Sequence, residues 1–127
     1  MSRTIQTKSG SEFWTNVNSE SMIGELCKLT DAKYYDAFAE QLAFYKRNNL
    51  DASILDEKWY SPKMAYSMTE QEALDTANKL RSLLDKTEEI FPDFRHYFET
   101  GCTHEDLKYF LTYISEYFEK SEGYKCL

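Results

Sequence analysis

The stretch Thr103–Glu122, THEDLKYFLTYISEYFEKSE, decides the fold of this chain because it carries a helix start and a strong helical period. Thr103 can cap the helix, and Asp106 is a shorter version of the glutamate of a capping box. Apolar residues then recur at i, i+3, i+4, i+7 and i+11, which places them on one stripe of a helix. They are Leu107, Phe110, Leu111, Ile114 and Phe118. The stretch therefore predicts a helix that packs this stripe into the core and stops at Gly123.

The opposite side of the same helix is rich in tyrosine and carboxylate. It carries Tyr109, Tyr113 and Glu116, with Glu105 and Asp106 beside them and Tyr117 on the flank. In one interpretation the helix is central and other helices cover both of its sides, since a tyrosine ring packs while its hydroxyl reaches a polar group. In the other, the face binds a partner, because tyrosine is enriched at interface centres and carboxylates attract a basic protein.

The rest of the chain predicts an all-α fold, an irregular bundle of about five main helices in a single domain, 1–127. Scarce glycine (four) and proline (two) argue against a chain of many tight turns. The predicted main helices cover Ser19–Leu29, Thr30 or Asp31 to about Asn48, Thr69 to about Glu88, Pro92–Glu99 and Thr103–Glu122. We also expect a short helix over Ser11–Val17 and a frayed end over 1–10.

One longer, aromatic-rich loop interrupts the helices at Leu50–Met68, where Trp59 and Tyr60 precede Pro62. Such a loop either folds onto the core or forms a binding element. We favour anchoring on the core.

Charge is distributed unevenly along the 127 residues, whose net charge is −7. Residues 69–127 carry seven basic and thirteen acidic groups, a balance of −6, against −1 for residues 1–68. The C-terminal half is thus the expected docking surface for a basic partner, and nucleic-acid binding, which needs a basic patch, is disfavoured. No apolar run approaches a membrane span.

Candidate catalytic and metal-binding residues are few. His96 lies three residues from both Asp93 and Glu99, so a carboxylate could orient it as a general base, although such spacing arises by chance in charged helices. His96, Cys102 and His104, with Cys126 or Glu105 as a fourth ligand, match no standard zinc spacing. We therefore expect no catalytic residue, no metal and no cofactor. Cys27 is expected to be a buried apolar residue, and three cysteines without a CxxC pair fit a reducing cytoplasm.

In size, charge, predicted helical content and its acidic tyrosine face, the chain resembles bacterial immunity proteins, including those of contact-dependent growth inhibition systems. The face that carries the resemblance comprises Glu105, Asp106, Tyr109, Tyr113, Glu116 and Tyr117. The resemblance implies a non-catalytic cytoplasmic protein that binds and neutralises a basic, nuclease-like toxin domain, with no nucleic acid or membrane as partner.

Three alternatives stay open. An acidic mimic of nucleic acid, such as a phage inhibitor, would need carboxylates spaced like phosphates, but seven basic residues interrupt the acidic half. A homodimeric helical scaffold would use the tyrosine face as its dimer interface. An enzyme would act through His96.

Overall fold

The computed structural model describes residues 3–10, 14–15 and 17–126. Its α-helices there are α1 (Val17–Leu29), α2 (Ala37–Arg47), α3 (Glu70–Arg81), α4 (Thr87–Phe94) and α5 (His104–Ser121). The 3-10 helices are η1 (Ala52–Ile54), η2 (Glu57–Trp59) and η3 (Arg95–Tyr97). The strands are β1 (Arg3–Thr7), β2 (Trp14–Thr15), β3 (Tyr34–Tyr35), β4 (Lys63–Met64), β5 (Ser67–Met68) and β6 (Tyr124–Cys126). The fold is mixed, and the all-α prediction is wrong.

An antiparallel sheet joins the two ends of the chain, in the strand order β2-β1-β6-β5 among the described residues. β1 pairs with β6 through Ile5 and Cys126, and with β2 through Thr4 and Trp14. Arg3–Thr7, expected to be frayed, is thus an inner strand. Trp14 lies in a strand rather than in a helix over Ser11–Val17, and Phe13 of that predicted helix lies outside the described residues.

The sheet strands alternate in burial, because only one face of each strand packs against the core. Ile5 and Thr7 are buried while Gln6 between them is exposed, and in β6 Tyr124 is buried while Lys125 is exposed. This period of two places one face of each strand on the helices. The hydroxyl of Tyr124 donates to the backbone oxygen of Ala65 at 2.7 Å, which ties β6 to the segment between β4 and β5.

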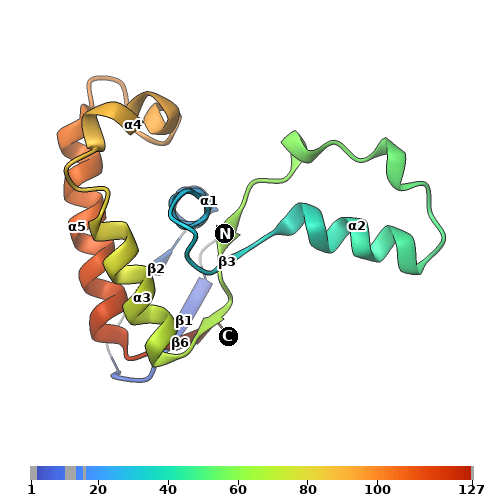
Figure 1. The fold of residues 1–127 in the computed structure, drawn as a ribbon, viewed down its shortest axis with the longest axis horizontal. Coiled ribbons are helices and arrows are strands. Elements are labelled where there is room, and N and C mark those ends of the chain that lie inside the picture. Colours follow the sequence, from blue (N-terminus) through green and yellow to red (C-terminus); the bar gives the residue numbers. More distant parts are fainter. Residues whose placement is uncertain (1–2, 11–13, 16, 127) are drawn as a thin grey trace.

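The core lies between the sheet, α1, α3 and α5, and α5 runs antiparallel to α3 (Figure 1). On α5 the predicted stripe is buried: Leu107, Leu111, Ile114 and Phe118 are fully inaccessible and Phe110 is partly buried. The helix begins and ends where the sequence predicts. Gly123, at φ +100°, turns the chain into β6, and a Cβ there would lie 2.8 Å from the Met68 backbone oxygen.

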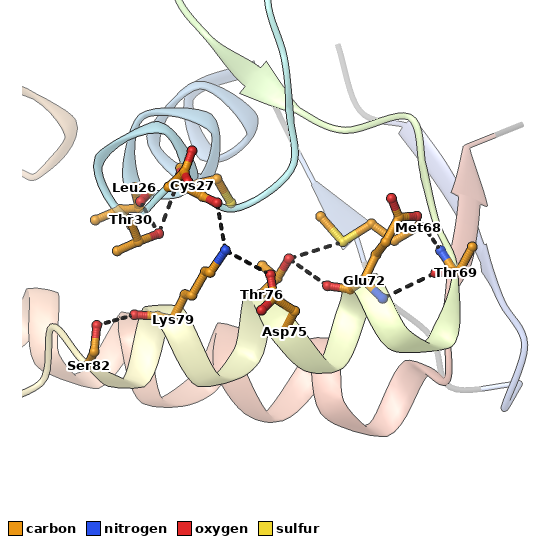
Figure 2. A network of polar contacts seen from close by, with 11 residues as sticks. Leu26, Cys27, Thr30, Met68, Thr69, Glu72, Asp75, Thr76, Lys79 and Ser82 are labelled. Carbon is orange, nitrogen blue, oxygen red and sulfur yellow. Dashed lines mark hydrogen bonds and ion pairs between the residues drawn. The ribbon is translucent and has the colours of Figure 1, made fainter.

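A polar network fixes α3 against the end of α1 (Figure 2). The ammonium of Lys79 donates to the backbone oxygen of Asp31 at 2.7 Å and pairs with Asp75 at 3.0 Å. Asp31 lies two residues beyond the end of α1, so this bond ties α3 to the turn that follows α1. At the other end of α3, Thr69 and Glu72 form the predicted capping box.

The capping box makes a testable contribution to stability. Glu72 accepts from the Thr69 N–H at 2.9 Å, and this bond, with Lys33 at 3.3 Å, holds the pKa of the Glu72 carboxyl below its ordinary 4.5. A carboxyl whose pKa is lower in the folded state stabilises the fold at any pH above its unfolded-state pKa. This stabilisation is lost as the pH falls through its folded-state pKa. Glu72→Gln should therefore lower the free energy of unfolding by about 0.5–1 kcal/mol at neutral pH.

Urea unfolding of wild type and Glu72→Gln between pH 7 and pH 3 measures this difference. The gap should be largest above pH 4.5 and shrink below it. Glu70→Gln, an exposed change in the same first turn, is the control. A gap that stays constant with pH would show that the carboxylate charge plays no part.

Residues 36–62 form an arm that leaves the body of the molecule. The two-residue ribbon of β3 and β4 closes its base, with Tyr34 opposite Met64, and α2 projects away from α1, α3 and α5 (Figure 1). In the sequence, the helical spacing of Tyr35, Phe38, Ala39, Leu42 and Tyr45 predicts a side that faces the core. That prediction is wrong for α2, because its eleven residues are all described and none is buried.

Several helix boundaries differ from those predicted. α2 is capped by Asp36, whose side chain accepts from the Ala39 N–H at 3.0 Å, because Tyr34–Tyr35 is drawn into the ribbon. It ends at Asn48, as predicted. α3 ends at Arg81 rather than near Glu88, and Pro92 lies inside α4 instead of beginning a helix.

Candidate functional site: the exposed face of α5

Two tyrosines stand out on the side of α5 that faces away from the core. Tyr109 is 79% exposed and Tyr113 is 52% exposed, the former being the highest value for a large apolar or aromatic side chain among the described residues. Four residues apart, they are neighbours one turn apart on the helix. The opposite side of the same helix is packed into the core through Leu107, Leu111, Ile114 and Phe118, which are fully inaccessible.

Carboxylates flank these rings, and the exposure of their side chains is high. It reaches 70% at Glu105, one turn before Tyr109, and 57% at Glu116, just beyond Tyr113. Lys120 lies 4.0 Å from Glu116, so one positive charge borders the patch. We define the tyrosine face of α5 as Glu105, Tyr109, Tyr113 and Glu116.

Asp106 has a structural role beside this face. Its Oδ2 accepts from the Thr103 N–H at 2.7 Å, while the Thr103 hydroxyl accepts from the Glu105 N–H at 3.3 Å. The predicted capping box is therefore present. Although Asp106 is exposed, a substitution there would damage the start of α5 as well as any binding.

Tyr117 is not part of the tyrosine face, because it is only 7% exposed. Its ring lies 5.7 Å from that of Phe118. Burial, and the nearby Cys126 and Tyr113, raise the pKa of its hydroxyl well above the ordinary 10. Cys126 belongs to β6, so the terminal strand that the sequence did not reveal helps to enclose this residue. The other five predicted site residues lie along the exposed side of α5.

A second exposed apolar surface lies on the arm, where the sequence predicts a loop that packs on the core. Phe44, Leu50, Ile54 and Trp59 are 46–64% exposed. The predicted anchoring of Leu50–Met68 is correct only for its end, since Met64, Ala65 and Met68 are buried. A hollow of about 480 Å³ opens at the base of the arm between Phe38, Tyr60 and Lys28.

The candidate catalytic groups are not assembled into a site. His96 is exposed, its ring lies 4.1 Å from that of Tyr97, and among the described residues no carboxylate is within ion-pair distance of it. The described residues contain no group of three or more metal-ligating side chains placed to hold a metal ion. Burial raises the pKa of the Cys27 thiol to about 12, which keeps it protonated and unreactive.

Among the described residues, no helix combines the length and apolar character that crossing a membrane requires. No family model matches the sequence, and comparisons with curated proteins and with solved structures give no match either.

Proposed function

We propose that this chain is a non-catalytic cytoplasmic binding protein that neutralises a basic, nuclease-like toxin domain through the tyrosine face of α5. One observation carries the proposal: Tyr109 and Tyr113 are exposed side by side on a helix whose other side packs into the core. A folded domain gains nothing in stability from exposing two large rings. Tyrosine rings are typical anchors of protein interfaces.

The mechanism would be steric and electrostatic. Glu105 and Glu116, together with the −6 balance of residues 69–127, would attract a basic partner and speed its association. Tyr109 and Tyr113 would then enter the dry centre of the interface and slow dissociation. The bound chain would cover the active surface of the toxin, and no chemical step is needed.

The two halves of this mechanism predict different kinetics. Tyr113→Ala should weaken binding by about 2 kcal/mol, roughly thirtyfold, mainly through faster dissociation. Glu105→Lys combined with Glu116→Lys should slow association and flatten its dependence on salt. Surface plasmon resonance against the captured partner at several salt concentrations measures both effects. Glu57→Lys, a charge reversal on the distant arm, is the matched control and should change neither rate.

The partner itself is found by a pull-down from bacterial lysate at low salt. The proposal expects one basic protein that salt releases, that stops growth when expressed alone, and that is harmless when this chain is co-expressed. A captured protein that binds Tyr109→Ala and Tyr113→Ala as tightly as wild type would exclude the tyrosine face as the site. Recovery of the chain without a basic partner would overturn the function.

A further inference from the structure

We infer that the outer face of α2 is the interface of a symmetric homodimer, in which the arms of two copies pack antiparallel. The inference is independent of the tyrosine face. The first argument is that α2 should be unstable without a packing partner. α2 has eleven residues, and isolated helices of this length are marginal in water. A helix whose described residues include none that is buried lacks the packing that normally stabilises it.

The two sides of α2 differ, and the outer one forms a compact stripe. Phe38, Leu42 and Tyr45 are partly buried, and the ring of Phe38 lies 5.9 Å from that of Tyr60 on the returning chain of the arm. The other side carries Glu40, Ala43, Phe44 and Arg47. These positions are i, i+3, i+4 and i+7, the spacing with which one helix packs on another.

The order of residues in this stripe identifies a second copy as the occupant. An apolar pair, Ala43 and Phe44, lies at the centre, with Glu40 before it and Arg47 after it. A two-fold axis passing between positions 43 and 44 places each Glu40 opposite the partner's Arg47, and each Phe44 opposite the partner's small Ala43. The stripe is therefore complementary to itself when the helices run antiparallel.

Charge within the single chain supports this pairing. Among the described residues neither Glu40 nor Arg47 makes an ion pair within the chain, and both are exposed. The whole arm has the same polarity. Its base carries four acidic residues, Asp36, Glu40, Asp56 and Glu57, and one basic residue, Lys58, whereas its tip carries two basic residues, Lys46 and Arg47, and one acidic residue, Asp51. Antiparallel arms bring each basic tip to the acidic base of the other, and helix dipoles also oppose favourably.

The chain exposes more surface than a compact fold of its mass. The accessible surface is 7928 Å², whereas a compact monomer of 15.0 kDa exposes about 7,000 Å². Each partner in an interface of standard size buries ~800 Å², and the arm would have to supply that area. Further exposed apolar side chains on the arm, Leu50, Ile54 and Trp59, offer the remaining contact surface.

Sedimentation equilibrium of the full chain tests the inference by charge exchange. Wild type should be dimeric. Glu40→Arg or Arg47→Glu alone should weaken dimerisation about tenfold or more, because each makes both symmetric pairs repulsive. The double variant Glu40→Arg/Arg47→Glu should restore the dimer. An equimolar mixture of the two single variants should also form a heterodimer, since both cross pairs are then opposite in charge.

The controls separate this interface from others. Lys86→Glu reverses an exposed charge outside the arm and should leave the dimer in place, as should Tyr109→Ala on α5. Circular dichroism should show every variant folded, because α2 contributes no buried residue among those described. Two results would overturn the inference: a monomeric wild type, or single reversals that the mixture fails to rescue. A dimer lost in Tyr109→Ala would instead place the interface on α5.

Discussion

Phe118→Ala should lower the free energy of unfolding by about 3–5 kcal/mol, the largest effect we expect from any single truncation in α5. Phe118 is fully inaccessible, and its ring lies 5.7 Å from that of Tyr117 and 6.0 Å from that of Tyr124. Removing it leaves a cavity at the point where α5 meets the sheet. The cost combines lost burial with the contacts that the cavity wall loses.

Tyr109→Ala is the matched control on the same helix. Its ring is 79% exposed, so we expect a change within about 0.5 kcal/mol. Urea denaturation followed by circular dichroism measures both variants. Equal losses in the two variants would contradict the assignment of a buried and an exposed face to α5. They would also remove the basis for proposing a binding role for Tyr109.

Gly24→Ala should destabilise the protein by about 1–3 kcal/mol or more, although the change favours helix formation elsewhere. α1 passes directly beneath β4 at Gly24. A Cβ there would lie 2.5 Å from the backbone nitrogen of Lys63 and 2.5 Å from the carbonyl carbon of Pro62. Neither is the movable end of a side chain, so backbone must shift.

The direction of the effect makes this test sharp. Alanine is better than glycine inside a helix by about 1 kcal/mol, so a Gly24→Ala protein that is more stable than wild type would disprove the close contact. Thermal unfolding monitored by calorimetry gives the answer. Leu29→Ala, at a 54% exposed position at the end of α1, should change stability little and controls for substitution in this helix.

The candidate site could be predicted from the sequence only in part. Tyr109, Tyr113, Glu105 and Glu116 are exposed as their helical positions require, since a single period of 3.6 residues determines both faces of α5. Tyr117 lies on the flank, where that period does not decide burial. It is enclosed because β6, which includes the nearby Cys126, returns beside α5.

For the arm the prediction failed in the opposite sense, because residues predicted to face the core lie outside it. Its apolar residues have the spacing of a core helix, and the sequence therefore predicts that Phe38, Leu42 and Tyr45 face inward. The ribbon of β3 and β4 instead holds the helix away from the body. Amphipathic spacing indicates that a face needs covering, but it does not say whether the same chain or a second copy covers it.

The features that could be predicted correctly from the sequence are those whose physical cause is local. The caps at Thr69 and Thr103, the buried stripe of α5, the stop at Asn48 and the turn at Gly123 all depend on residues within a few positions of one another. Only the tertiary structure decided the sheet and the projection of α2. β1 is five residues long and β6 three, and strands this short do not show a reliable period in the sequence. These two strands pair with each other although they lie at opposite ends of the chain. Strand pairing over that separation comes from backbone hydrogen bonds, which any residue except proline can make, so side-chain pattern alone did not reveal it.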